Sequence, residues 1–521
     1  YMRVSGSAPL ILTSLALLAF CKYVSASTIE RVAPAPAALS DASGSEVKSR
    51  TDANAILTAA ELVSIGQQLL QAKRYDDAVT YFNKALKAGY FEPALIGRAS
   101  AYMLIGQLDS ALTDYSAVLA RDSRSADALF GRASVYIARQ QRALALDDLN
   151  AAIALAPDPR FSTIALALRA HVFEDAQEYT KAGDDFFAAG RISPTTPSLF
   201  FHLAGLMYEK ANQNGRAVAV LSQAIDLDPH DADLYQSRGR MYKKQRDLGR
   251  ALNDYTTSVR LDPTDVDQHQ SLADLLDTMG QKEAALDEDN EVVRLAPDSA
   301  ESYVARAQIF TELGRDVEAR RDYAEAERIA PGTPRLVHSR MQFLFYQGDY
   351  AGAVADANAW LAAPTRSKDP VNVAYTLLWR HIAMQRQRID DRADLEAATS
   401  PLPIRDQWPY PLIEFSLTRI DETQLRAAAS RGDPITSQEH LCEASAYIGE
   451  RYASHGQNPQ AKSAFQTAMA ICPVSFIEHD LAIRGLKQIA TALGQAGASV
   501  HSWKSDQHLS TATANKPATP Q

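Results

Sequence analysis

The stretch that decides the fold is HDADLYQSRGRMYKKQRDLGRALNDYTTSVRLDP, residues 230–263. Its small residue Gly239, counted here as position 8, is followed three residues later by the aromatic Tyr242. Ala251 comes nine residues further on, a second aromatic four after that, and Pro263 closes the stretch. This order predicts two antiparallel helices, because small residues let helices approach closely and a proline stops the second one.

The same landmarks recur along most of the chain. The alanine equivalent to Ala251 returns every 33 to 37 residues, at Ala78, Ala111, Ala145, Ala182, Ala217, Ala251, Ala285, Ala319 and Ala353. This period and these landmarks resemble the tetratricopeptide repeat (TPR). The resemblance implies an all-α fold, a right-handed superhelical solenoid of helix-turn-helix repeats with an irregular C-terminal section and a capping helix.

The period also divides the chain into segments. It fails where prolines cluster near Trp408 and returns at Gly449 and Tyr452. Small and polar residues dominate both ends of the chain. We expect a signal peptide at 1–26, a flexible linker at 27–54, nine repeats at 55–365, irregular helical hairpins at 366–438, a final repeat plus capping helix at 439–494, and a disordered tail at 495–521.

The N-terminal region has the features of a targeting segment. Leu10 to Cys21 is apolar over about a dozen residues, too short for the ~20 that a membrane helix needs. Small residues at Val24-Ser25-Ala26 predict cleavage after Ala26, which would send the chain to the periplasm or outside the cell. The alternative is a lipid on Cys21 and an anchored envelope protein, although Phe20 stands where a lipidation motif has a small residue.

Composition narrows the function. The 521 residues include 53 Lys and Arg against 63 Asp and Glu, which gives a net charge of −10. This balance argues against nucleic acid or an anionic membrane surface as the main partner. The sequence also lacks phosphate-binding glycine loops, nucleophile elbows and zinc motifs. We therefore expect no enzyme, no catalytic residue, no metal and no cofactor.

The last third carries a second resemblance. Over roughly 371–490 it looks like the carboxy-terminal half of the new-lipoprotein-I type of bacterial envelope TPR proteins. The residues that carry this resemblance are Gln407-Trp408, Glu414-Phe415, Glu439-His440-Leu441, Glu443, Tyr447-Ile448-Gly449, Tyr452, Phe465, Ala468 and Phe476-Ile477-Glu478-His479. Proteins of that type are non-enzymatic, dimer-prone adaptors that bring an envelope protease to cell-wall hydrolases.

This resemblance implies a periplasmic or envelope scaffold that binds a protein or peptide partner along its concave groove. A homodimer is then one expected assembly, and membrane association would come only from a lipid or a partner. The alternative function is a TPR subunit of an envelope machine that exports polysaccharide or protein.

Polar residues are expected to line the groove. In TPR arrays, positions 2, 5, 9 and 12 of the first helix face it, which favours as partner-binding candidates His171, Glu174, His202, Gln236, Arg240, Lys243, Asp274, Asp277, Gln308 and Gln342. His171, Glu174 and His202 could together hold a metal or act as a base, but we prefer to interpret them as ordinary polar lining.

An arginine and an aspartate recur together in six repeats. They stand at positions 7 and 23, and the pairs are Arg98 with Asp114, Arg132 with Asp148, Arg169 with Asp185, Arg238 with Asp254, Arg306 with Asp322 and Arg340 with Asp356. The other repeats lack the arginine. Matched presence and absence favour an ion pair inside each repeat over a row of arginines that binds carboxylates.

Cys442 and Cys472 stand at positions 1 and 31 of the final repeat. Because the two helices of a hairpin run antiparallel, the start of one and the end of the other lie side by side. We expect a disulfide there in an oxidising compartment. The alternative is two buried free cysteines.

Overall fold

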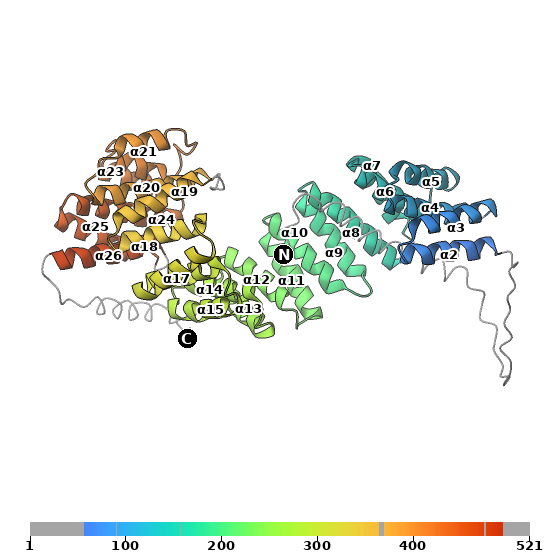
Figure 1. Cartoon of the computed structure of the whole chain (residues 1–521), viewed down its shortest axis with the longest axis horizontal. Helices are drawn as coiled ribbons and strands as arrows, with labels where there is room; N and C mark the ends of the chain where they lie inside the picture. Colours follow the sequence, from blue (N-terminus) through green and yellow to red (C-terminus); the bar gives the residue numbers. More distant parts are fainter. Residues whose placement is uncertain (1–56, 90, 157, 364–368, 474–475, 493–521) are drawn as a thin grey trace, which may run out of the picture. The chain divides into compact units, whose positions relative to one another are not determined.

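A computed structural model describes residues 57–89, 91–156, 158–363, 369–473 and 476–492 (Figure 1). These residues form 25 α-helices and no strand, so the predicted all-α class is confirmed. None of these helices is both long and apolar enough to cross a membrane. The expected signal peptide (1–26), linker (27–54) and tail (495–521) lie outside the described residues.

The chain divides into two compact units, the first ending at Leu261 and the second beginning at Asp262. The first unit stacks six helical hairpins. Its helices are α2 (Ala59–Gln71), α3 (Tyr75–Lys87), α4 (Phe91–Leu104), α5 (Leu108–Arg121), α6 (Ala126–Ala138), α7 (Arg142–Ala154), α8 (Pro159–Asp175), α9 (Tyr179–Ile192), α10 (Pro197–Lys210), α11 (Asn214–Leu227), α12 (Ala232–Lys244) and α13 (Leu248–Leu261).

The second unit begins with three further hairpins and ends with a less regular part. Its helices are α14 (Val266–Thr278), α15 (Lys282–Leu295), α16 (Ala300–Glu312), α17 (Asp316–Ile329), α18 (Pro334–Tyr346), α19 (Tyr350–Ala362), α20 (Pro370–Arg386), α21 (Arg392–Thr399), α22 (Tyr410–Ser416), α23 (Glu422–Ala429), α24 (Pro434–Ser454), α25 (Asn458–Ile471) and α26 (Ile477–Ala492).

The turn inside each hairpin has a constant geometry. Position 15, just after the first helix, adopts a positive φ in the left-handed region, for example +81° at Gly106 and +73° at Gly280. The backbone N–H of the next residue, Gln107, then donates to the carbonyl of Tyr102, five residues back. This bond closes the helix end and reverses the chain at the same point in every repeat.

The predicted small and aromatic landmarks form the core. All nine landmark alanines from Ala78 to Ala353 are at most 1% exposed, and Phe82 and Tyr115 at position 24 are as deeply buried. Tyr115 packs onto the next repeat so tightly that a Cβ on Gly131 would come within 2.3 Å of its ring. Stacking therefore supplies the core, as the repeat pattern predicts.

The irregular section differs from its expected bounds. Residues 366–438, where irregular helical hairpins are expected, hold α20 followed by three short helices, α21 to α23. The first helix of the final repeat, α24, already begins at Pro434, where Asp433 caps it, and not at 439. The prediction missed this start because α24 has two additional helical turns before the first position of the 34-residue pattern.

Cys442 and Cys472 form a disulfide, with their Cα atoms 4.8 Å apart. Cys472 caps the end of α25, as the spacing predicts. Cys442 lies inside α24 instead of at its start, because α24 begins earlier than expected. The bond therefore joins the two helices of the final hairpin near the end of the array.

Replacing both Cys442 and Cys472 by serine is expected to destabilise this hairpin by about 3.5 kcal/mol, because the bond closes a loop of 30 residues. Hydrogen exchange of α24 and α25 measures the local loss of protection. Reduction of the unchanged protein should reproduce the effect. Equal protection in the oxidised, reduced and substituted proteins would contradict the prediction.

Candidate functional site

The first helices of successive repeats share one face of each stack. In the first unit α2 contacts α4, α4 contacts α6 and α10 contacts α12, and in the second unit α16 contacts α18. Side chains near the ends of these helices therefore meet across repeat boundaries. We call this face of α8, α10 and α12 the first groove.

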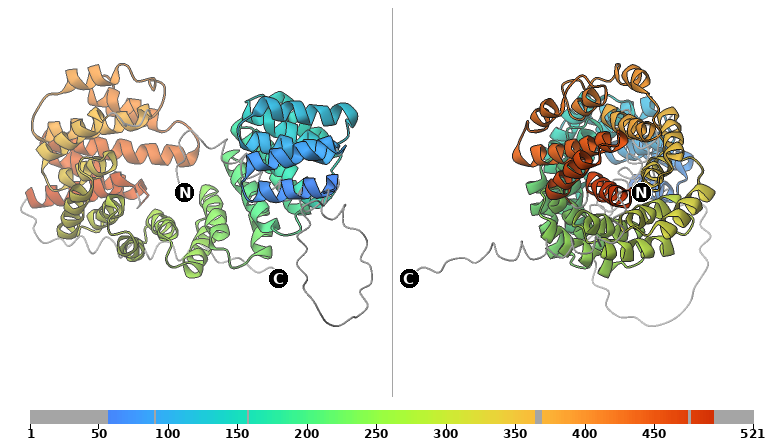
Figure 2. Two further views of the ribbon diagram at one scale, coloured as in Figure 1. Left: turned by 45° about the vertical axis from the view of Figure 1, so that its right-hand side comes forward. Right: turned by 90° about the vertical axis from the view of Figure 1, so that its left-hand side faces the viewer.

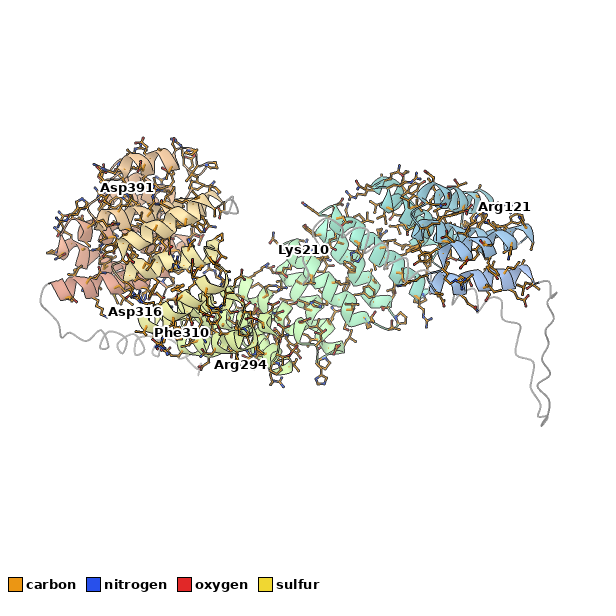
Figure 3. The ribbon with its side chains drawn as sticks, in the orientation of Figure 1. Arg121, Lys210, Arg294, Phe310, Asp316 and Asp391 are labelled. Atoms are coloured by element: carbon orange, nitrogen blue, oxygen red, sulfur yellow. A yellow bond between two sulfur atoms is a disulfide. The ribbon has the colours of Figure 1, made fainter. Side chains whose placement is uncertain are left out.

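Acidic and basic side chains alternate along the first groove. The Lys210 ammonium lies 2.6 Å from a Glu174 carboxylate oxygen, and Figure 3 shows Lys210 on α10. One repeat further on, Glu209 lies 2.9 Å from both Arg240 and Lys244. The basic partners remain open to solvent, with the Lys210 and Arg240 side chains 47% and 40% exposed.

The three residues considered for metal or base chemistry take separate roles. His171 contacts Glu174 at 3.4 Å, and its hydrogen bond together with Lys210 lowers the pKa of Glu174 to about 2. His202 instead contacts the Ser237 hydroxyl of the following repeat at 3.0 Å, and burial lowers the pKa of its imidazole. Across the described ranges, no three His, Cys, Asp or Glu side chains are arranged to hold a metal.

Most of the other groove candidates are half-buried polar side chains. Gln236 and Lys243 lie on α12, Gln308 lies on α16 and Gln342 lies on α18, while Asp274 on α14 is exposed. These side chains are spread over several repeats of their units, so they supply hydrogen-bonding groups over a broad surface.

The six arginine–aspartate pairs form across the two helices of their repeats. Nε and Nη2 of each arginine donate to the two carboxylate oxygens over 2.7 to 2.9 Å. The pairs are Arg98 with Asp114, Arg132 with Asp148, Arg169 with Asp185, Arg238 with Asp254, Arg306 with Asp322 and Arg340 with Asp356. The aspartates are buried, so these bidentate bonds fix the angle between the two helices.

Asp114 shows why these carboxylates are structural groups. It lies on α5, is 5% exposed, and accepts from Nε and Nη2 of Arg98 over 2.7 Å each. The hydrogen bond to Asp114 raises the pKa of the Arg98 guanidinium. Both oxygens of Asp114 are therefore engaged inside the repeat, and the carboxylate is buried away from any partner in the groove.

A third contact, which the sequence did not predict, links five of these arginines to the preceding repeat. Nη1 donates to an oxygen on the previous second helix, as from Arg98 to Asn83 at 2.5 Å and from Arg238 to Ser222 at 3.0 Å. The equivalent bonds run from Arg169 to Asn150, from Arg306 to Asn290 and from Arg340 to Glu327.

The predicted pair inside each repeat is present, and this third contact adds a bond to the repeat before it. Arg98 holds Asp114 within its repeat and Asn83 of the repeat before it at the same time. The prediction missed the bond because it compared positions only within one hairpin. The arginines therefore connect repeats and are not a free row of ligands for carboxylates.

Helix α26, red in Figure 2, lies against the ends of α16 and α18 in the second unit. Arg484 of α26 donates to the Thr311 carbonyl at the end of α16, and its guanidinium lies 4.7 Å from the Tyr346 ring centre. The Tyr346 hydroxyl in turn donates to the Ile477 carbonyl over 3.3 Å. Arg484 also lies 3.5 Å from Asp316, which Figure 3 labels at the start of α17. We call this side of α14, α16 and α18 the second groove.

The second groove is crowded with carboxyl groups. Lys282 bonds to Glu312 and lies 3.5 Å from the predicted groove residue Asp277. Burial, Asp277 and Asp480 of α26 raise the pKa of Glu312 to about 8, and the attraction of Lys282 only partly opposes this. Asp277 is thus already engaged within its own unit.

A capping helix was predicted at this end of the chain, but its place in the groove was not. The contacts that put it there join residues 131 to 173 positions apart. A local sequence pattern does not show which distant helices α26 contacts. The one signal was Arg484, a charged residue on a helix that was expected to close an apolar core.

Comparison with known proteins finds one family and several solved structures that are similar to this chain. A tetratricopeptide repeat family model matches residues 96–160, 203–266 and 271–334. A tetratricopeptide repeat protein from Parabacteroides merdae is 18% identical, with 49% of this chain and 97% of that chain covered and a TM-score of 0.40. Yeast Tom70 is 14% identical, with 86% and 99% covered and a TM-score of 0.33. The family match and the stacked helical hairpins show that the chain contains tetratricopeptide repeats.

Proposed function

We propose that this chain is a non-enzymatic adaptor that binds an extended segment of a protein partner along the first groove. The observation that carries the proposal is the alternation of partly buried acidic and half-exposed basic side chains, Glu174 with Lys210 and Glu209 with Arg240, across successive repeats. The Lys210 and Arg240 side chains stay 47% and 40% exposed, so they can also attract acidic groups of a partner segment.

We infer an envelope location from the sequence around the expected cleavage site. An apolar segment of signal-peptide length followed by Val24-Ser25-Ala26 is typical of export. A disulfide between Cys442 and Cys472 fits an oxidising compartment. The resemblance of residues 371–490 to new-lipoprotein-I adaptors supports an envelope protease or a cell-wall hydrolase as the class of partner.

The location is tested on the protein recovered from cells. The expected mature N-terminus is Ser27, and the chain should be released by osmotic shock. Intact-mass measurement and N-terminal sequencing check both points. Recovery of an acylated chain that begins at Cys21 would replace this proposal with a lipid-anchored protein.

The groove is tested by site-specific photo-crosslinking in intact cells. A photoreactive residue at Gln236 or Lys243 of α12 is expected to capture the partner, and the same residue at the exposed Gln223 of α11 is the control on a second helix. Capture of a soluble protease or hydrolase only from α12 supports the adaptor. Capture of integral export subunits would favour a role in an export machine. Equal capture from α11 would show that the partner does not bind specifically along the first groove.

A further inference from the structure

The second groove holds an occupant from its own chain. The apolar face of α26 packs on the final repeat through Leu481, Ala482 and Ile489, which are at most 5% exposed. Its opposite side reaches the ends of α16 and α18 through Arg484. A helix lying in a hydrophobic and polar groove is a common mode of peptide recognition.

The first turn of α26 places acidic side chains beside the acidic side chains of the second unit. Glu478 is 8% exposed, and burial together with Glu443 and Asp480 raises its pKa to about 8. Glu443 already accepts hydrogen bonds from Tyr375 and Trp408, and burial raises its pKa to about 7. Two carboxyl groups brought together away from water cannot both remain ionised cheaply.

Further carboxyl groups lie near this first turn. Asp480 of α26 faces the Lys282 and Glu312 side chains, so three carboxylates, including Asp277, share one lysine. The Tyr346 and Tyr447 hydroxyls, also near Glu478, are neutral because burial and these carboxylates raise their pKa. Arg484 and Asp316 pair with each other further along the helix.

The contacts of Arg484 show that the second groove binds a guanidinium group. Its guanidinium donates to a carbonyl, lies beside a carboxylate and stacks over an aromatic ring at the same time. With α26 removed, Asp277 and Glu312 would still share Lys282, and Asp316 would lose Arg484. The emptied groove would therefore be acidic.

We propose that the second groove is the docking site of a basic amphipathic helix from a protein partner, and that α26 is a displaceable occupant. The partner helix carries a lysine or arginine where α26 has Glu478, and an arginine where it has Arg484. A small residue stands in the place of Gly485, because a Cβ there would come within 2.5 Å of the Phe465 ring.

Protons strengthen the hold of α26. Glu478 of α26 has a pKa raised to about 8 where docking buries it, and Asp480 adds to the raised pKa of Glu312, so docking takes up protons between the ordinary value of 4.5 and about 8. Docking is therefore strongest below this range and weakens as the pH rises through about 8. Access of the partner helix should increase in the same direction.

The affinity test uses the full oxidised chain and two labelled peptides that span residues 476–492. One peptide has the native sequence, and the other carries Glu478→Lys. The basic peptide is expected to bind at least tenfold more tightly in fluorescence anisotropy at pH 7.5. Equal binding would overturn the charge argument and point to α26 of a second copy as the occupant.

Variants of the chain separate displacement of α26 from surface binding. Arg484→Gln removes the best contact of α26 and should increase the affinity for the basic peptide about tenfold. Lys487→Gln, on the exposed side of the same helix, is the matched control and should leave the affinity unchanged. Identical affinities in both variants would mean that the peptide binds elsewhere.

The pH dependence supplies an independent measurement. Hydrogen exchange of α26, corrected for the intrinsic rate, should show less protection at pH 9 than at pH 7 in the unchanged protein, whereas Glu478→Gln should reduce this difference. The same loss in both proteins would overturn the proton dependence. These experiments test only the second unit, so they can fail while the first-groove proposal holds, and the reverse.

Discussion

Replacing Asp254 with alanine is expected to destabilise α12 and α13 by about 4 kcal/mol, because it leaves the Arg238 guanidinium half-buried without its carboxylate. The Asp254 side chain is 2% exposed and accepts both bonds of the pair. The stranded cation would stay between the Tyr235 and Tyr242 rings, 5.7 and 5.9 Å from their centres. Hydrogen exchange resolved to single helices measures the effect, since each repeat contacts mainly its neighbours.

Two further variants show whether the effect comes from the stranded charge. The double variant Arg238→Met with Asp254→Leu should recover most of the loss, because well-packed apolar residues often replace a buried ion pair without cost. Glu291→Ala, which removes the partner of Arg294 in an exposed pair, should change stability by less than about 1 kcal/mol. A double variant as unstable as Asp254→Ala would show that the pair itself, and not the unpaired charge, matters.

Periodic features of this protein were predictable because each repeat places the same position in the same surroundings. Ala78 and Ala353 stand at opposite ends of the regular repeats, yet both are buried at the contact between two helices. The pairing of Arg132 with Asp148 followed from two positions one residue out of level on antiparallel helices. The contacts within one hairpin therefore predict most of the contacts within the other regular hairpins of both units.

The non-periodic features were not predictable in the same way. The oxygen that Nη1 reaches belongs to an asparagine for Arg98, Arg169 and Arg306, whereas Arg238 reaches a serine and Arg340 a glutamate, so the residue type of the acceptor varies. The docking of α26 depends on how far the second unit curves, which is the sum of many small rotations between repeats. The burial of Glu478 follows from that docking and could not be known before it.

Replacing Phe465 with alanine is expected to destabilise the final hairpin by about 4 kcal/mol and to release α26 before α24 and α25 unfold. The Phe465 ring is fully buried on α25. A Cβ added at Gly449 of α24 or Gly485 of α26 would come within 2.5 Å of it, so the ring fills the space among three helices. Hydrogen exchange should show the largest loss of protection in α26, and Phe465→Leu should cost much less.

The effect of Gly485→Ala on the stability of α26 is expected to be opposite in the unchanged chain and in Phe465→Ala. This difference would identify the contact between Gly485 and Phe465. In the unchanged chain the new methyl group meets the Phe465 ring at 2.5 Å, which should destabilise α26 by about 2 kcal/mol. In Phe465→Ala the same methyl group enters the space that the ring has left, and alanine is favoured over glycine inside a helix by about 1 kcal/mol. The second substitution should then restore part of the lost protection of α26. If Gly485→Ala were destabilising in both backgrounds, Phe465 would not be the residue that seats α26, and its position in the second groove would have to rest on Arg484 alone.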